Sequence, residues 1–267
     1  MLDLEKTMKE YQKMEDACAC AQTLIHMDEI KRRVAKYWNQ RAEGFSSQRL
    51  REWGSEKHDL WLEEFQKYLP NGRQLNILDV GTGTGFFAML LSSRGHRVTG
   101  IDLSENMIDE AEKTAAQLGL PAEFFVMDAE CPDLKPSSFD VIITRNLTWA
   151  LPNLQRAYGS WHGLLKPSGV LLNFDADYCR ENANQTLPEN HAHKEISADL
   201  MKEYEYIKEE LRPRQRPRPA WDLELLETAG FHKMQVDYTV WQRIYHSFDE
   251  FYNLSLIHIS EPTRRSY

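Results

Sequence analysis

Hydrophobic and polar positions follow two different periods along this chain, and the period changes near residue 71. Before that point, apolar residues recur at helical spacing, which predicts three helices, over residues 1–22, 28–42 and 57–68. After it, short apolar runs alternate with amphipathic segments. The runs predict strands at 75–80, 96–101, 122–127, 139–144 and 169–174, and the segments predict helices at 86–94, 104–118 and 154–165. Strands that alternate with helices predict an α/β fold in three layers, with a mostly parallel sheet between two layers of helices.

The alternation stops after residue 177, where a polar stretch begins. We interpret 178–220, with one helix expected at 197–211, as an insert that covers the carboxyl edge of the sheet as a lid. A helix at 221–230 and a long strand at 232–245 are expected to follow. The expected organisation is one domain over 1–253, made of N-terminal helices (1–70), a ligand-binding core (71–177), the lid insert (178–220) and a terminal helix and strand (221–253).

The bulk composition narrows the kind of partner that the chain can have. Its 267 residues carry a formal net charge of −9, so the broad positive field that attracts nucleic acid is lacking. Four cysteines without regular spacing, and an N-terminus without an apolar leader, favour a cytoplasmic protein. No apolar stretch is long enough for a membrane span, and no pattern indicates an oligomeric state. His191 and His193 stand two residues apart, which does not suit a helical metal site, so we expect no bound metal.

A glycine-rich turn stands between the first expected strand and the helix after it. Its sequence is Asp79-Val-Gly-Thr-Gly-Thr-Gly85. Glycine permits a tight turn and a close approach of the backbone to a ligand, and the free N–H groups of a helix start favour a carboxylate or phosphate. The turn alone is compatible with NAD enzymes, flavoproteins and methyltransferases alike.

Acidic residues end three successive expected strands, at Asp79, Asp102 and Asp128. The carboxyl ends of parallel strands meet at one crevice, where an open α/β sheet binds its ligand. Asp102 stands near the offset at which a carboxylate accepts both hydroxyls of a ribose, with capping of the helix from Leu103 as the alternative. Asp128 is placed to meet the amino group of an adenine.

Five motifs together resemble the successive motifs of class I S-adenosylmethionine-dependent methyltransferases of the small-molecule, ubiquinone-type group. They are Ile77–Gly85, Gly100–Met107, Asp128–Glu130, Phe139–Ile143 and Leu164–Leu172, and their order and spacing match over 37–175. The resemblance implies a Rossmann-like fold, with S-adenosyl-L-methionine as the cofactor. A hydride-transfer enzyme usually carries Gly-x-Gly-x-x-Gly, whereas here the third glycine comes one residue early.

The resemblance also implies a role for individual residues. The glycine loop would pass the methionine part of the cofactor, Asp102 would hold the ribose, and Met107 would pack on the adenine beside Asp128 and Ala129. Tyr37, on an N-terminal helix that lids the site, would reach the cofactor carboxylate. The residues expected to bind the cofactor are Tyr37, Asp79, Gly81, Thr82, Gly83, Thr84, Gly85, Asp102, Leu103, Met107, Asp128, Ala129, Glu130 and Arg145.

Substrate contacts are expected just past the fourth and fifth strands. Asn146 would face the methyl group, and Asp175 is the best candidate for a general base or an amine-binding group. Trp149, Asp177 and Tyr178 are the further substrate candidates. The alternatives are that Asp175 or Asp177 caps the next segment and that Trp149 is packing. An aromatic stripe that packs the N-terminal helix is the alternative for Tyr37 and the preferred interpretation for Trp38.

The expected reaction is therefore methyl transfer to an oxygen, nitrogen or carbon atom of a small molecule. Three alternatives stay open: a methyltransferase acting on tRNA or protein, an NAD-binding oxidoreductase, and a non-catalytic cofactor-binding module.

The segment 254–267 has a different character from the rest of the chain. Leu254-Ser-Leu-Ile-His-Ile-Ser-Glu-Pro-Thr-Arg264 resembles the translation of a sequencing adapter, so we interpret this tail as artefactual. The family closes its sheet with an antiparallel strand at this place. We expect that strand to be missing, or replaced by the alternating residues 254–259, with a loss of stability.

Overall fold

A single twisted sheet organises the computed structural model, which describes residues 4–180, 196–244 and 256–262. Within that part of the chain the sheet has seven strands in the order β3-β2-β1-β4-β5-β7-β6. The strands are β1 (Asn76–Val80), β2 (Arg97–Asp102), β3 (Glu123–Val126), β4 (Phe139–Arg145), β5 (Leu165–Asp175), β6 (Phe231–Val236) and β7 (Leu256–Pro262). β1 to β5 pair in parallel, and β7 runs antiparallel to both β5 and β6.

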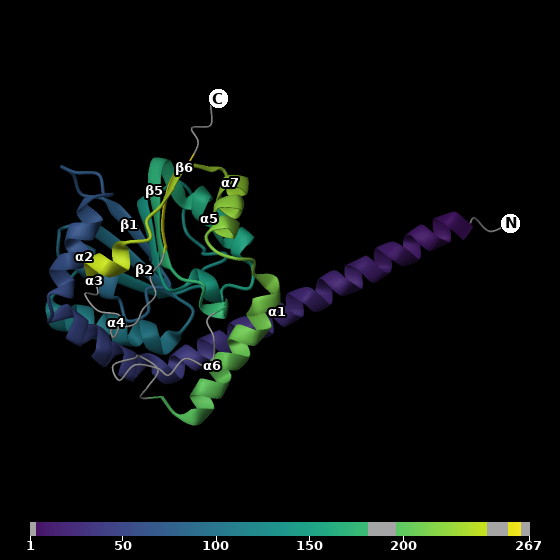
Figure 1. The fold of residues 1–267 in the computed structure, drawn as a ribbon, viewed down its shortest axis with the longest axis horizontal. Helices are drawn as coiled ribbons and strands as arrows, with labels where there is room; N and C mark the ends of the chain where they lie inside the picture. Colours follow the sequence, from purple (N-terminus) through teal and green to yellow (C-terminus); the bar gives the residue numbers. More distant parts are fainter. Residues whose placement is uncertain (1–3, 181–195, 245–255, 263–267) are drawn as a thin grey trace.

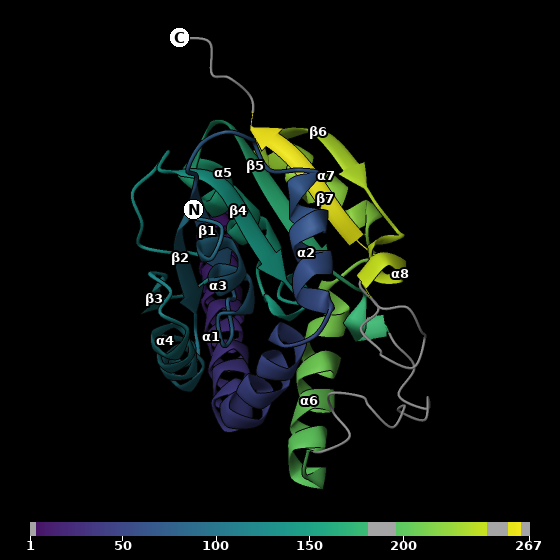
Figure 2. The ribbon, with the colours of Figure 1, turned by 90° about the vertical axis from the view of Figure 1, so that its left-hand side faces the viewer.

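Helices cover both faces of this sheet, as Figures 1 and 2 show. They are α1 (Leu4–Trp53), α2 (Lys57–Gln66), α3 (Phe86–Ser92), α4 (Glu105–Leu118), α5 (Leu154–Leu164), α6 (Ala198–Leu211), α7 (Ala220–Ala229) and α8 (Val240–Ile244), with 3₁₀ turns η1 (Thr148–Ala150), η2 (Tyr178–Arg180) and η3 (Arg212–Arg214). The expected Rossmann-like three-layer sandwich is confirmed. Among the described residues, no helix is both long enough and apolar enough to cross a membrane.

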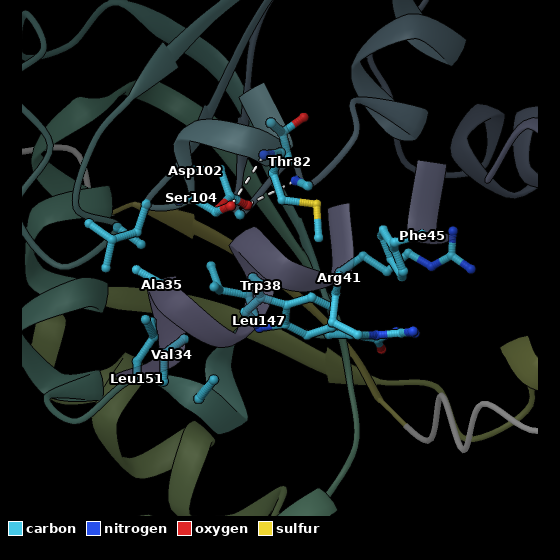
Figure 3. A pocket seen from close by; sticks show the side chains of 18 of the residues that line it. Val34, Ala35, Trp38, Arg41, Phe45, Thr82, Asp102, Ser104, Leu147 and Leu151 are labelled. Carbon is cyan, nitrogen blue, oxygen red and sulfur yellow. Dashed lines mark hydrogen bonds between the residues drawn. The ribbon is translucent and has the colours of Figure 1, made fainter. Parts of the chain in front are cut away.

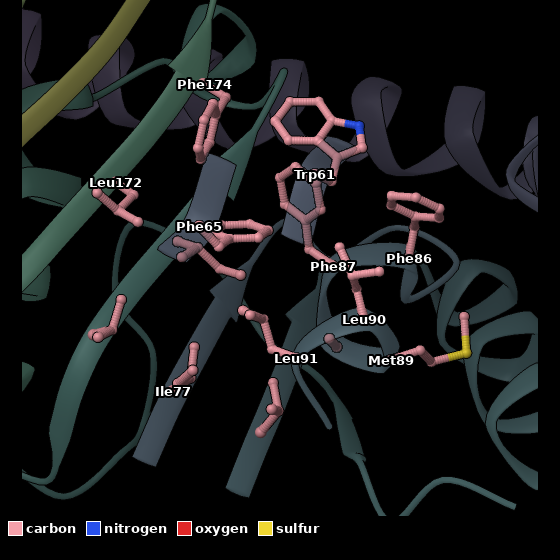
Figure 4. Close-up of a cluster of buried hydrophobic side chains, with 14 of the residues drawn as sticks. Trp61, Phe65, Ile77, Phe86, Phe87, Met89, Leu90, Leu91, Leu172 and Phe174 are labelled. Atoms are coloured by element: carbon pink, nitrogen blue, oxygen red, sulfur yellow. The ribbon is translucent and has the colours of Figure 1, made fainter. Parts of the chain in front are cut away.

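Side-chain alternation along the strands produces two hydrophobic layers. Ile77 and Leu172 belong to the cluster beneath α2, α3, α4 and α8, whereas their neighbours Leu78 and Leu171 belong to the cluster beneath α5 and α7. The first cluster is rich in aromatic rings (Figure 4), and the rings of Trp61 and Phe87 meet edge to face with centroids 4.7 Å apart. Both faces of the parallel strands are therefore buried, which explains their nearly continuous apolar runs.

The N-terminal region differs from the expectation of two separate helices, because α1 is one continuous helix. The stretch between the two expected helices, 23–27, holds no Gly or Pro that would stop a helix. Asp28, where the second helix was expected to begin, lies inside α1, and ion pairs such as Glu29–Arg33 link successive turns. Figure 1 shows the N-terminal part of α1 extending away from the sheet, while its C-terminal part runs along the edge of the sheet.

The end of the sheet also differs from expectation in part. The long strand predicted at 232–245 is wrong, because β6 ends at Val236. Asp237 accepts hydrogen bonds from the Thr239 backbone N–H and hydroxyl, both at 2.7 Å, and this local turn starts α8.

The final antiparallel strand of the sheet is β7, which comes from the adapter-like tail. Of the two expectations for this strand, that it is missing or that it is replaced by the tail, the second is confirmed. Five residues of β7 pair with β5, from Leu256 opposite Asp175 to Ser260 opposite Leu171. The origin of these tail residues stays a prediction, and so does their effect on stability.

Candidate functional site

A cleft opens where the carboxyl ends of the parallel strands meet α1 (Figure 3). It holds about 1350 Å³ of open space, including the part that faces solvent, which is ample for a nucleoside-sized ligand and a second small molecule. The strand ends contribute the lining residues Asp79, Gly81, Thr82, Gly83, Asp102, Leu103, Met107, Asp128, Ala129, Arg145, Asn146, Leu147, Trp149 and Tyr178. The helices α1 and α6 contribute Lys31, Val34, Ala35, Trp38, Arg41, Phe45, Arg49 and Tyr204.

The glycine loop forms the floor of this cleft. Asp79 holds the loop from below, since one of its carboxylate oxygens accepts hydrogen bonds from the Thr82 hydroxyl at 2.6 Å and the Ala88 N–H at 3.1 Å. Gly81 and Gly83 both have a positive φ, of 65° and 54°. A Cβ on Gly81 would lie 2.8 Å from the Leu147 side chain, so only glycine fits there.

Asp102 joins two segments at the centre of the cleft. One of its oxygens accepts from the Gly83 N–H and the other from the Ser104 N–H, both at 2.9 Å, as Figure 3 shows. The cap of α4 is Ser104, whose hydroxyl accepts from the Met107 N–H at 3.2 Å. Asp102 therefore fixes the loop geometry without serving as the N-cap, and it also lines the cleft. Burial raises the pKa of its carboxyl above the usual value.

Asp79 gives a testable pH dependence of stability. Burial raises the pKa of its carboxyl to about 7. Between pH 4 and 7 the folded chain therefore keeps a proton that the unfolded chain releases, so this group lowers stability as pH rises through that window. Asp79→Asn cannot titrate. Its free energy of unfolding relative to the native chain should rise by on the order of 3 kcal/mol from pH 4 to 7 in urea titrations. A difference that does not change with pH would contradict this assignment.

A buried charge cluster closes the cleft near α2. Glu52 accepts hydrogen bonds from Arg145 Nη2 at 3.0 Å and from Trp61 Nε1 at 3.0 Å, and it also pairs with Arg49. Burial alone would raise the pKa of Glu52, but Arg145 and Arg49 bring it down to about 2. The Arg145 guanidinium also lies over the Trp61 and Phe87 rings. Because two guanidiniums share one carboxylate, this end of the cleft is positively charged.

The wall past β4 presents three of the expected substrate residues together. The Tyr178 hydroxyl donates to Asn146 Oδ1 at 3.0 Å, and Trp149 Nε1 donates to the Asn146 carbonyl at 2.9 Å. Asn146 has a positive φ of 55°, and its N–H donates to the Phe174 carbonyl at 2.8 Å. Trp149 packs edge to face on Tyr178 and on Tyr204. The structure thus makes one rigid polar and aromatic wall of Asn146, Trp149 and Tyr178.

Six expected site residues do not line the cleft: Tyr37, Thr84, Gly85, Glu130, Asp175 and Asp177. Tyr37 is buried between Trp38 and Tyr204, as its packing alternative expects. Trp38 packs on Tyr37 and Phe45, as its preferred interpretation expects, and it also lines the cleft. Thr84 is buried beside α1, and Gly85 packs its backbone against Phe124.

The two carboxylates after β5 lie behind the wall rather than in the cleft. Asp175 is fully buried and accepts from the Trp149 N–H at 3.0 Å, from Thr148 and from Arg218. Asp177 accepts from the Arg218 N–H at 3.4 Å. Both carboxylates are hydrogen-bonded behind the wall and not toward the cleft. Asp175 therefore does not lie where a general base would contact a substrate, and its position supports the alternative that it caps the next segment.

An N-terminal helix over the site was expected, but the residues with which α1 lines the cleft were not predicted. These lining residues are Lys31, Val34, Ala35, Trp38, Arg41, Phe45 and Arg49. They recur every three or four positions, so they form one mixed apolar and basic stripe on a single helix face. That periodicity was the available signal. This periodicity was not recognised because the helix as a whole has little amphipathic character.

The expectation of no metal concerns a segment outside the described residues, since His191 and His193 lie in 181–195. Within the part of the chain that is described, no group of three or more His, Cys, Asp or Glu side chains could hold a metal ion.

Comparison with known proteins connects this geometry to a family. A profile of the methyltransferase domain matches residues 77–169. The ubiquinone biosynthesis O-methyltransferase of Coxiella burnetii is 35% identical over 97 residues, which are 36% of this chain and 42% of that protein. Phosphoethanolamine N-methyltransferase 1 of Arabidopsis thaliana is 38% identical over 108 residues, 39% of this chain and 21% of that protein. The chain thus spans less than half the length of these relatives.

Solved structures agree on the fold. A putative methyltransferase in complex with the Trm112 activator of Haloferax volcanii superposes with a TM-score of 0.58 at 18% identity, covering 84% of this chain and 97% of that one. A putative S-adenosyl-L-methionine-dependent methyltransferase from Methanococcus maripaludis gives 0.57 at 13% identity, covering 85% and 94%. With the strand order, these matches show that the chain has the Rossmann-like fold of these methyltransferases, and its residues 77–169 are similar to a methyltransferase domain.

Proposed function

We propose that this chain binds S-adenosyl-L-methionine in the cleft beneath α1 and transfers its methyl group to a small molecule. The observation that carries the proposal is the meeting of the Gly81–Gly83 loop with Asp102 on the floor of a covered, mostly apolar cleft. A carboxylate at this strand end suits a ribose diol, because its two oxygens accept from neighbouring hydroxyls.

The residues present fit such a cofactor along the whole cleft. Gly81 and Gly83 line the cleft without side chains, so a ligand can approach their backbone closely. Leu103, Met107 and Ala129 offer apolar surface for an adenine, and Asp128 stands at that end. At the other end Arg49 and Arg145 supply cations that suit the methionine carboxylate. The charges and the shape of the cleft therefore favour the same orientation of the bound cofactor.

The chain's own residues then act by positioning and by excluding water. The bound cofactor supplies an activated methyl group, and the carbon–sulfur bond breaks as the bond to the acceptor atom forms. Asn146, Trp149 and Tyr178 would hold the acceptor in line, since their mutual hydrogen bonds fix the wall before the acceptor arrives. Among the described residues the wall itself contributes no carboxylate, and Asp175 behind it is bonded to Thr148, Trp149 and Arg218, which favours positioning over general-base catalysis.

A small-molecule acceptor is supported by the enclosure of the cleft. α1 and α6 cover it together, joined by the Arg33–Glu203 ion pair at 2.8 Å and by packing of Tyr37 on Tyr204. The named relatives modify ubiquinone precursors or phosphoethanolamine, as their names state. The net charge of −9 also disfavours a nucleic acid acceptor.

The test is a screen of metabolite extract with methyl-labelled S-adenosylmethionine, analysed by mass spectrometry. The proposal predicts label in a small molecule, in amounts that fall when Asp102→Ala replaces the native chain. Label that moves only to protein or tRNA would overturn the choice of acceptor, and no transfer with any fraction would favour a non-catalytic binding module.

A further inference from the structure

Lys31 of α1 links the helix to two carboxylates on the far side of the cleft. Its ammonium lies 2.7 Å from Asp128 Oδ2 and 2.5 Å from Glu130 Oε2. The Lys31 side chain is 13% exposed and that of Glu130 only 2%, so this ion pair is shielded from solvent. Burial opposes the charge, yet hydrogen bonds to both carboxylates raise the pKa of Lys31, so the ammonium stays charged. Removal of one partner of such a pair is costly, because it leaves a buried charge without compensation.

The two carboxylates are held very differently. Glu130 is fixed within the domain, since its other oxygen accepts from the Asn153 N–H at 2.6 Å and its carbonyl accepts from the Ser160 hydroxyl. The Asp128 side chain is 34% exposed and lines the cleft, and its carboxylate accepts from Lys31 and from the Glu130 N–H at 2.9 Å. Lys31 can therefore give up Asp128 to a ligand without becoming an unpaired buried charge, because Glu130 retains it.

A second attachment fastens α1 to the start of α4. Asn39 Oδ1 accepts from the Ser104 hydroxyl at 2.7 Å, and the Asn39 carbonyl accepts from Asn106 Nδ2 at 3.1 Å. Lys31 and Asn39 are eight residues apart, which is about 12 Å along a helix. Val34, Ala35 and Trp38 lie between the two attachments and line the cleft (Figure 3). The two attachments therefore hold this span of α1 over the cleft.

We propose that Lys31 is the latch of this span, anchored on Glu130, and that it sets how fast an adenosyl ligand enters and leaves the cleft. This inference rests on the proposed cofactor site. Of the two attachments, the one at Lys31 stands at the Asp128 end, where the adenine is placed, and it is a single flexible side chain. The Asn39 attachment involves backbone and side chain together, so it stays closed and acts as the hinge when the Lys31 attachment opens.

The test follows S-adenosylhomocysteine by stopped-flow tryptophan fluorescence, for which Trp38 in the cleft is a suitable reporter. Lys31→Met should speed both association and dissociation, with dissociation faster by at least about 10-fold. Lys31→Arg, which keeps both ion pairs, should remain within about threefold of the native rates. Lys36→Met, at an exposed position of the same helix, is the matched control and should change neither rate.

The outcomes separate the latch from simple structural damage and from failure of the proposed function. A latch speeds association, whereas a damaged site slows it, so weaker binding with slower association would overturn the inference. Unchanged rates in Lys31→Met would overturn it as well, while leaving the cofactor site intact. If Glu130 is the anchor, Lys31→Met combined with Glu130→Gln should dissociate no faster than Lys31→Met alone. A native chain that binds no S-adenosylhomocysteine would contradict the proposed function itself.

Discussion

Replacement of Asp102 by Ala should weaken S-adenosylhomocysteine binding by at least about 100-fold. The carboxylate would accept two hydrogen bonds from a ribose, and each charge-assisted bond lost contributes about 1.5–3 kcal/mol. The variant also loses the bonds to the Gly83 and Ser104 N–H groups, which loosens the glycine loop at the same time. Titration calorimetry with S-adenosylhomocysteine measures the change directly.

Two controls make the Asp102 result specific. Asp102→Asn keeps the shape and one acceptor oxygen, so its loss of affinity should lie between those of the native chain and the Ala variant. Asp109→Ala removes an exposed acid from α4, close in sequence, and should leave the affinity unchanged. If Asp102→Ala binds within threefold of the native chain while folding normally, Asp102 does not hold the ribose.

Glu52→Ala should lower the free energy of unfolding by about 3–5 kcal/mol, the largest stability effect that we expect. The substitution removes the carboxylate that the buried guanidiniums of Arg49 and Arg145 share, and the Trp61 indole N–H loses its acceptor. Urea unfolding followed by tryptophan fluorescence measures the loss. Because Arg145 lines the cleft, a weaker affinity for S-adenosylhomocysteine should accompany it.

The pH dependence distinguishes the lost charge from lost packing. The pKa of Glu52 is lowered to about 2 in the folded chain, below the ordinary value of 4.5. Its contribution is therefore fully present above pH 4.5 and is lost as pH falls toward 2. The difference between the native chain and Glu52→Ala should shrink over that range. Glu43→Ala, at an exposed position of α1, should cost less than about 0.5 kcal/mol at any pH. A difference for Glu52→Ala that is independent of pH would point to packing alone.

The floor of the cleft could be predicted from the sequence because local rules determine it. A strand, a glycine turn and a helix start follow one another in the chain, so Gly81, Gly83 and Asp102 are placed by their neighbours. The same holds for the layers of the sheet, since alternation of apolar residues along each strand determines which face they bury. These parts of the account need no knowledge of distant contacts.

The cover of the cleft could not be predicted in the same way. Lys31 and Asp128 are 97 residues apart, and Arg33 and Glu203 are 170 apart, so no local pattern links them. Asp175 shows the converse problem. Its position after a parallel strand suggested a catalytic group, but bonds to Thr148, Trp149 and Arg218 turn it away from the cleft. Whether a strand-end carboxylate faces the ligand depends on partners that the fold alone brings near.

The third glycine of the loop, Gly85, illustrates a residue that belongs to a motif for a reason other than ligand contact. A Cβ there would lie 2.9 Å from the Phe124 ring and 3.1 Å from Ala111, so this glycine permits close packing of α3 and α4 on the sheet. The early position of this glycine, which distinguishes the motif from that of hydride-transfer enzymes, therefore reflects packing within the fold.

Calorimetric titration of the native chain with S-adenosylhomocysteine, and in parallel with NADH, tests the central claim most directly. The arrangement of Gly81, Gly83 and Asp102 beneath α1 predicts one site per chain for S-adenosylhomocysteine, lost in Asp102→Ala, and no heat of binding for NADH. Saturable binding of NADH without any binding of S-adenosylhomocysteine would contradict the account.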